Sequence, residues 1–348
     1  MTTPLRMGVI GIDHRHIYTM VSHMQDAGAV LAGWWTSGTP ETLDGFVRRF
    51  PDAPRVAQAK ALLEDPSIDV ILTAAVPCDR AGIALDAMDS GKDVMTDKPG
   101  CLTLDQLAAL RAKVAATGRI WSVDFSERFE VPSVTAAAEL VAQGAIGRVI
   151  HTTGLGPHRL NRDSRPGWFF DPARNGGILT DIGSHQIDQF LFFAGADTAD
   201  IAMASTANRA NPQDPAFRDT GQIVLKAEGA DGFVRLDWFT PDGLPTWGDG
   251  RLFLLGTEGT IELRKYVDAG RSDASDTLIL TNGSRCETID ARGAGLPYFA
   301  RLIADIRERT ETAMPQAHPF TVMELAIRAQ AMADGDGGQD GEAEKAAP

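Results

Sequence analysis

The chain has 348 residues, 43% of them hydrophobic and 23% charged, an ordinary globular composition whose length favours two domains over one. Its formal net charge of −14 argues against nucleic acid and anionic membranes as partners, because both require a concentrated positive surface. The three cysteines show no paired or metal-like spacing, the N-terminus offers no signal peptide, and no apolar run approaches the roughly 20 residues of a membrane span. We therefore expect a cytoplasmic protein with no membrane or nucleic-acid partner.

The first third of the chain alternates short apolar runs with longer amphipathic ones, which is the pattern of parallel β-α-β units. The expected strands cover residues 7–11, 30–35, 70–75, 94–96 and 120–125. The expected helices cover residues 17–27, 43–50, 80–90 and 104–117. Residues 1–125 are therefore predicted to form an α/β domain built on a doubly wound parallel sheet.

The pattern changes after residue 125 to a second, α+β domain over residues 126–333. A helix at 131–143 and a strand at 148–154 precede an irregular stretch, 157–175. Further strands are expected at 201–207, 219–228, 232–239, 251–256, 260–264 and 277–281, and late helices at 297–312 and 321–333. This order predicts a large, mostly antiparallel sheet with one or two helices on a single face. Residues 334–348 lack large apolar side chains, which predicts a disordered acidic tail.

One segment, residues 176–188, combines a glycine turn with two acids and a histidine. On a helix, Asp181, His185 and Asp188 fall at i, i+4 and i+7, so they share one stripe, turned away from the packing surface that includes Ile187 and Phe190. An acid beside a histidine orients the ring and raises its proton affinity, which suits proton transfer near neutral pH. The alternative is a solvated polar helix face.

The turn after the first strand stands where a dinucleotide pyrophosphate would meet a helix N-terminus, but its glycine fingerprint is broken. Starting at Gly11, the pattern G-x-G-x-x-G has Asp13 and His16 at its second and third glycines. One interpretation makes Asp13 a helix cap that accepts from the amides of Arg15 or His16, with Arg15 or a histidine facing the phosphates. The alternative is a tight turn without a ligand.

The second strand is followed by Thr36 and Ser37 instead of the acid that usually binds an unmodified ribose. No basic residue follows closely to neutralise a 2′-phosphate, since the nearest are Arg48 and Arg49. The choice between NAD and NADP therefore stays open.

A metal site is the further alternative at the first turn, formed by His14 and His16 with Asp13. No additional ligand stands at a suitable spacing, so the sequence predicts no metal.

Two distant segments together resemble the Gfo/Idh/MocA family of sugar and polyol oxidoreductases. Residues 91–99 (GKDVMTDKP) resemble the family's G-K-x-V-x-x-E-K-P motif, and residues 176–188 (GGILTDIGSHQID), preceded by Trp168, resemble its G-G-G-x-x-x-D-x-G-x-H-x-x-D motif. The chain departs from these motifs at Asp97, which replaces Glu, and at Asn175, which replaces the first glycine. The resemblance implies a Rossmann domain, NAD or NADP as cofactor, and a Lys98–Pro99 bond that is a candidate for the cis form.

The resemblance also implies roles for individual residues. Lys98 would stabilise the developing alkoxide, His185 would take the proton from a sugar hydroxyl, and Asp181 would orient His185 or contact a neighbouring hydroxyl. The implied cofactor-binding residues are Gly11, Ile12, Asp13, His14, Arg15, Thr36, Ser37, Pro77, Asp97 and Lys98.

The irregular stretch before the second motif is a candidate substrate wall, because a tryptophan face and several donors suit a sugar ring. Its candidate residues are His158, Arg159, Arg165 and Trp168, and the alternative is a polar connecting loop. We expect an NAD(P)-dependent dehydrogenase or reductase that acts on a carbohydrate, inositol or related polyol as a homodimer or homotetramer. A lyase or glycosidase that oxidises and re-reduces its substrate is the second hypothesis, and a non-catalytic cofactor sensor is the third.

Overall fold

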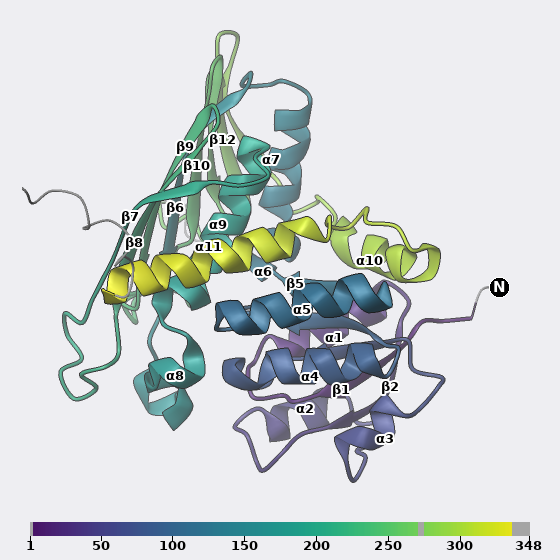
Figure 1. Cartoon of the computed structure of the whole chain (residues 1–348). Helices are drawn as coiled ribbons and strands as arrows, with labels where there is room; N and C mark the ends of the chain where they lie inside the picture. Colours follow the sequence, from purple (N-terminus) through teal and green to yellow (C-terminus); the bar gives the residue numbers. More distant parts are fainter. Residues whose placement is uncertain (1–2, 271–274, 336–348) are drawn as a thin grey trace, which may run out of the picture.

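A computed structural model describes residues 3–270 and 275–335 and shows two sheets with their helices (Figure 1). The predicted acidic tail, 334–348, lies outside the described residues except for Asp334 and Gly335, which end the last helix. No helix of the described chain is long and apolar enough to cross a membrane.

The N-terminal domain contains the predicted doubly wound parallel sheet, in the strand order β2-β1-β3-β4-β5. Its strands are β1 (Arg6–Ile10), β2 (Val30–Trp35), β3 (Val70–Thr73), β4 (Asp93–Asp97) and β5 (Trp121–Asp124). Its helices are α1 (Ile17–Asp26), α2 (Leu43–Arg49), α3 (Ala59–Leu63), α4 (Pro77–Asp89) and α5 (Leu104–Thr117). The Rossmann prediction is confirmed.

Strands β3, β4 and β5 are buried at every residue, because helices cover both faces of the sheet. Helices α4 and α5 lie side by side on one face, and α1 lies on the other (Figure 1). The strand order reverses between β1 and β3, so the carboxyl ends of these strands open the crevice in which α/β sheets place ligands.

The C-terminal domain is built on an eight-stranded sheet, in the order β13-β12-β11-β10-β6-β9-β8-β7. All neighbours pair antiparallel except β6 and β9, which pair parallel, so the mostly antiparallel prediction is confirmed. The strands are β6 (Val149–Pro157), β7 (Asp200–Ala207), β8 (Thr220–Ala227), β9 (Ala230–Asp237), β10 (Arg251–Gly256), β11 (Gly259–Arg264), β12 (Thr277–Asn282) and β13 (Cys286–Asp290).

Helices cover one face of this sheet, and the longest of them form the boundary with the N-terminal domain (Figure 1). The helices are α6 (Ser126–Phe129), α7 (Pro132–Ala142), α8 (Pro172–Asn175), α9 (Ile178–Ala194), α10 (Pro297–Glu308) and α11 (Ala317–Asp334), with two 3-10 turns at Arg162–Ser164 and Gly167–Phe170. Helix α9 runs between the sheet and α11 and is buried over nearly its whole length.

The last helix, α11, also contacts the free edge of the parallel sheet. The Gln316 Oε1 atom, next to the start of α11, accepts a hydrogen bond from the Trp121 backbone N–H of β5 at 2.9 Å. The Phe320 ring stacks on the Trp121 indole with centroids 5.0 Å apart. Both domains therefore depend on this helix for packing.

Strand β13 was not predicted, because its residues lack a buried face. Four of its five residues are exposed, so the apolar alternation that marks a strand is absent from Cys286–Asp290. It pairs with β12 at the edge of the sheet.

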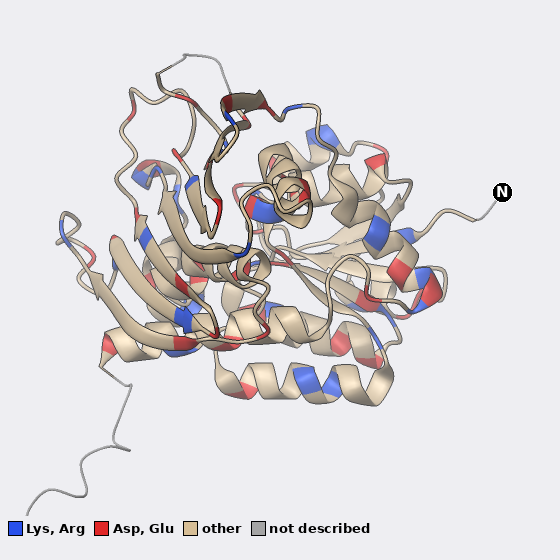
Figure 2. Cartoon of the chain, turned by 90° about the horizontal axis from the view of Figure 1, so that it is seen from above, with Lys and Arg blue, Asp and Glu red and all other residues tan. Residues whose placement is uncertain are grey.

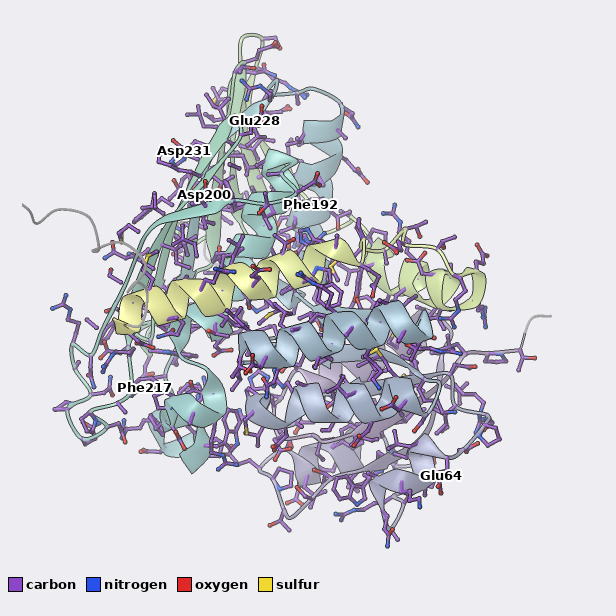
Figure 3. The ribbon with its side chains drawn as sticks, in the orientation of Figure 1. Glu64, Phe192, Asp200, Phe217, Glu228 and Asp231 are labelled. Carbon is purple, nitrogen blue, oxygen red and sulfur yellow. The ribbon has the colours of Figure 1, made fainter. Side chains whose placement is uncertain are left out.

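Acidic and basic residues are interspersed along the described chain (Figure 2). Asp200, Glu228 and Asp231 lie together at the end of the large sheet that points away from the N-terminal domain (Figure 3). Phe217, on the loop beside α8, packs against Phe170 with ring centroids 5.2 Å apart (Figure 3). The acidic surplus is thus spread over the molecule and does not define a binding site.

Candidate active site

A cleft of about 330 Å³ opens where the carboxyl ends of β1 and β4 face helix α9. It brings together predicted residues from the first turn, both motifs and the irregular stretch. These are Asp13, His14, Arg15, Lys98, His158, Arg159, Arg165, Trp168, Asp181 and His185. Gly11, Ile12, Thr36, Ser37, Pro77 and Asp97 do not line it.

Lys98 and Asp181, one from each motif, form an ion pair inside the cleft. The Lys98 Nζ atom lies 2.5 Å from Asp181 Oδ1, and the two side chains are 5% and 19% exposed. Burial acts to raise the pKa of Asp181, but the Lys98 ammonium outweighs it and holds that pKa below its ordinary value. The Asp181 carboxylate is therefore ionised near neutral pH.

The backbone around Lys98 is fixed by a buried guanidinium. Arg80, on α4, is 1% exposed and donates to the carbonyl oxygens of Ala75 at 2.8 Å and Asp97 at 3.1 Å, and also to that of Lys98. The Lys98–Pro99 peptide bond is cis, as anticipated. Arg80 thus sets the position from which the lysine side chain enters the cleft.

His185 lies on α9 one turn after Asp181 and is 1% exposed. Its Nδ1 atom has no hydrogen-bond partner among the described residues. Burial lowers the pKa of His185 to about 3, although the Glu127 carboxylate acts in the opposite direction. The imidazole is therefore neutral near pH 7. The prediction that a neighbouring acid raises its proton affinity is wrong, because burial outweighs Glu127 and Asp181 pairs with Lys98 instead.

Glu127, which the sequence analysis did not identify, is a buried carboxylate in the same cleft. Its Oε2 atom accepts from Gln186 Nε2 and from Lys265 Nζ, each at 2.8 Å. Burial would raise the pKa of Glu127, but Lys265 and the nearby histidines hold it well below its ordinary value. Lys265 is 138 positions away in the chain, so no local pattern could have indicated this pair.

Asp188, the third member of the predicted stripe, does not reach the cleft. Its carboxylate accepts from Arg128 Nε at 2.8 Å and Nη2 at 2.6 Å, and lies 2.7 Å from His318 Nε2. Asp188 is 0% exposed, and the stripe is buried rather than turned away from the packing surface. Both the stripe prediction and its solvated alternative are therefore wrong at this residue, because α11 and α6 cover α9.

The turn after β1 has the tight geometry of a dinucleotide-binding turn but lacks the predicted cap. Gly11 has φ +81°, and a Cβ atom there would lie 2.5 Å from Ala75 Cβ, so only glycine fits. The N-cap of α1 is His16, and no described side chain caps this helix. The interpretation of Asp13 as the cap is therefore wrong; burial raises the pKa of its carboxyl.

The two histidines of this turn point at Asp97. His14 Nδ1 lies 2.8 Å from Asp97 Oδ2, and His16 Nδ1 lies 2.8 Å from Asp97 Oδ1. Arg80 Nη2 also donates to Asp97 Oδ2 at 2.8 Å. Burial would raise the pKa of Asp97, but Arg80 and the histidines hold it well below its ordinary value. Asp97 is thus a buried carboxylate beneath the cleft.

A basic residue lies closer to the Thr36–Ser37 turn than the sequence indicated. The Arg55 Nη2 atom is 3.5 Å from the Thr36 carbonyl oxygen, and the guanidinium packs over the Trp34 ring at 5.0 Å. An irregular segment pairs residue 55 with β2 through an isolated parallel bridge, which the strand pattern did not reveal. Pro77 is the first residue of α4 and lies outside the cleft.

The irregular stretch forms one wall of the cleft, but its arginines are mostly bound to backbone. Arg159 Nη2 donates to the carbonyl oxygens of Pro241 and Leu244 at 2.8 and 2.5 Å, and Arg165 Nε donates to that of Leu160 at 2.8 Å.

The aromatic part of this wall is larger than predicted. Trp238 and Trp247 line the cleft together with Trp168. The centroid of the His158 ring lies 5.3 Å from that of Trp238 and 4.5 Å from that of Trp247. Burial lowers the pKa of His158 to about 4, with Glu127 opposing. His158 is therefore neutral near pH 7 and adds an uncharged ring to the three indoles of this wall.

Comparisons with known proteins agree with this geometry. The oxidoreductase family with an NAD-binding Rossmann fold matches residues 5–125, and the Gfo/Idh/MocA C-terminal domain matches residues 134–262. A crystal structure from Erwinia carotovora atroseptica SCRI1043, described as an oxidoreductase with no named substrate, is 48% identical with a TM-score of 0.92, covering 94% of this chain and 98% of that one. The chain belongs to the Gfo/Idh/MocA family.

Two curated dehydrogenases are similar to the chain over most of its length. The scyllo-inositol 2-dehydrogenase (NAD(+)) of Bacillus subtilis 168 is 29% identical, covering 75% of this chain and 74% of that protein. The levoglucosan dehydrogenase of Pseudarthrobacter phenanthrenivorans is 27% identical, covering 81% and 71%. The chain is thus an oxidoreductase enzyme of a nicotinamide-dinucleotide-dependent family, as predicted.

The site of this Gfo/Idh/MocA chain fits a nicotinamide dinucleotide at its reactive end. The cleft is lined by residues 13–16, which follow the tight turn at Gly11, together with Lys98, Asp181 and His185. At the phosphate end, Arg15 is the cationic side chain of the turn; its guanidinium is 63% exposed and lies 3.5 Å from Glu41.

Proposed function

We propose that this chain transfers a hydride between a nicotinamide dinucleotide and a hydroxyl or keto carbon of a sugar, inositol or related polyol. The observation that carries the proposal is the Lys98–Asp181 ion pair at 2.5 Å in one cleft with the neutral imidazole of His185. The bound dinucleotide supplies the hydride acceptor or donor.

In the direction of oxidation, His185 accepts the proton of the substrate hydroxyl. Its lowered pKa keeps the imidazole neutral before the reaction, and the nearby Glu127 carboxylate favours the imidazolium that forms. Lys98 stabilises the negative charge that develops on the substrate oxygen, and Asp181 holds the ammonium in place. The oxygen loses its proton while the carbon loses its hydride, so charge balances in the carbonyl product.

The class of substrate follows from the wall of the cleft. Three indole rings, those of Trp168, Trp238 and Trp247, offer flat apolar surfaces of the kind that pack against a sugar ring. The acids and the lysine on the opposite side offer partners to several hydroxyls. The two curated relatives act on scyllo-inositol and levoglucosan by name, which supports the same class here.

We further propose that Arg55 favours NADP over NAD. The end of β2 offers Thr36 and Ser37 in place of a ribose-binding acid, and Arg55 approaches Thr36 within 3.5 Å. A guanidinium at this position can pair with a 2′-phosphate.

The uncovered face of the large sheet is proposed to join subunits in a homodimer or homotetramer. Phe253 and Leu255 of β10 are 36% and 44% exposed on this face, and neighbouring exposed apolar side chains are typical of an interaction surface. Light scattering of Leu255→Glu is expected to show a smaller assembly than wild type, and an unchanged mass would contradict the proposal.

The hydride-transfer proposal is tested by following the absorbance of the reduced nicotinamide with a panel of inositols, anhydrosugars and aldoses. We expect turnover with at least one of them, and its loss in His185→Gln. The matched control is His151→Gln, because His151 lies on β6 outside the cleft. Substrate cleavage without net change in the cofactor would favour the lyase or glycosidase, and dinucleotide binding without turnover would favour the sensor.

A further inference from the structure

The histidines of the β1–α1 turn and the carboxylate at the end of β4 are not used by the proposed hydride transfer. His14, His16 and Asp97 each bring one potential metal-ligand atom to this place, and the three atoms lie within 4.8 Å of one another. We propose that these three residues bind one divalent transition-metal ion at the edge of the cleft.

The donor set determines the class of ion. Two imidazole nitrogens and one carboxylate oxygen suit Zn²⁺, Fe²⁺, Co²⁺ or Mn²⁺, whereas Mg²⁺ and Ca²⁺ prefer sites built from oxygen alone. Three protein ligands leave positions open for water or a substrate oxygen.

The present contacts are close to those of a bound ion. Bonds of about 2.1 Å at angles near those of a tetrahedron or octahedron separate nitrogen and oxygen by about 3.0–3.4 Å. The Nδ1 atoms of His14 and His16 now lie 2.8 Å from Asp97 Oδ2 and Oδ1 respectively, so the nitrogen–oxygen contacts need to lengthen by about 0.2–0.6 Å. Each imidazole then carries its proton on Nε2 and remains neutral.

The ligands are held in place before the ion arrives. Arg80 donates to Asp97 Oδ2 at 2.8 Å, and a carboxylate has about four acceptor sites, so Asp97 can keep this ion pair while it binds the ion. The backbone N–H of His14 donates to the Ala74 carbonyl oxygen at 2.8 Å, which ties the turn to the end of β3.

The charges around the site are mixed, because the Arg80 guanidinium pairs with Asp97 whereas Asp13 adds an acidic side chain. Asp13 lines the same cleft, and its carboxylate makes no ion pair with a described residue. Lys98 is already paired with Asp181, so its charge is offset. His16 and Asp97, two of the three proposed ligands, are also positions at which the chain departs from the glycine fingerprint and the E-K-P motif. The ion gives these two departures a common physical reason.

The proposal is tested on the full chain, treated with a chelator and titrated with CoCl₂ in the absence of dinucleotide and substrate. Visible absorbance and calorimetry are expected to show one Co²⁺ per chain. His14→Gln and His16→Gln are each expected to weaken Co²⁺ binding by at least about tenfold. His151→Gln is expected to bind as wild type does, because His151 lies on β6.

Absence of stoichiometric Co²⁺ binding would overturn the proposal, as would wild-type affinity in the two turn variants or an equal loss of affinity in His151→Gln. If a variant does not fold, the proposal is still tested by a measurement on the wild-type protein. Paramagnetically shifted imidazole proton signals are expected on addition of Co²⁺, and their absence would also overturn it. Because no activity is measured, the result is independent of hydride transfer.

Discussion

Replacing Lys98 by methionine separates the charge of this side chain from its packing. At 2.5 Å in an effective dielectric of about 20, the attraction between Lys98 and Asp181 is roughly 7 kcal/mol before desolvation is subtracted. In Lys98→Met, Asp181 loses the charge that outweighs its burial, so its pKa rises. An unpaired buried charge costs about 3–5 kcal/mol. Because Asp181 can take up a proton in the variant, the expected loss of stability is smaller than this.

The effect on catalysis is expected to be larger than the effect on folding. Loss of the group that stabilises the alkoxide should lower kcat by about 10²–10³, equivalent to about 2.7–4 kcal/mol in the transition state. KM should change little, because the ground-state hydroxyl carries no charge for the ammonium to stabilise.

Lys92 is the matched control. It lies six positions earlier, is 5% exposed, and donates through Nζ to the Asp65 carbonyl oxygen at 2.5 Å, away from the cleft. Lys92→Met should destabilise the fold without lowering kcat. The assay is the initial rate of nicotinamide reduction with the best substrate of the panel. Equal kcat values for the two variants would refute the role of Lys98.

Three other predictions concern pH, folding and cofactor choice. The pKa of His185 is about 3 in the fold against 6.5 ordinarily, so the free energy of unfolding should decrease as the pH falls below about 6.5. His185→Gln should reduce the dependence of this free energy on pH by up to about 1.4 kcal/mol per pH unit, as measured by urea titrations at several pH values. An equal pH dependence in wild type and variant would contradict this. Arg128→Met leaves Asp188 unpaired apart from His318 and should cost about 3–5 kcal/mol, whereas the exposed Arg301→Met should cost little in the same titrations. Arg55→Ala should lower kcat/KM for NADP more than for NAD, and an equal fall for both would exclude the proposed contact.

Most of the fold was predictable because its signals are local. The alternation of buried runs and amphipathic helices identified the parallel sheet, and the strands of the second domain were found from their apolar alternation. Strand β13 was missed because it pairs at an edge with no apolar face of its own. The observed ends of helices and strands differ from the predicted ends by a few residues, because backbone hydrogen bonding and not side-chain polarity determines where an element ends.

The site was predictable where one motif carries several of its residues, and not where the fold joins distant ones. Lys98, Asp181 and His185 were identified from two motifs and lie in one cleft. The Glu127–Lys265 pair and the Asp97 contacts of His14 bring together positions 138 and 83 residues apart, for which no spacing rule exists. Asp188 shares the helical periodicity of the site, but its partners come from other elements, so periodicity alone assigned it wrongly.

The contact between α11 and β5 has a consequence for the synthesis of the chain. The Trp121 amide that Gln316 satisfies belongs to an edge strand, and the glutamine is made 195 positions later. Until then the nascent N-terminal domain presents an open strand edge and an uncovered indole, which are features that promote association between chains. A ribosome-bound chain that is stopped before α11 should therefore need chaperone protection, although every strand of its parallel sheet has already been made.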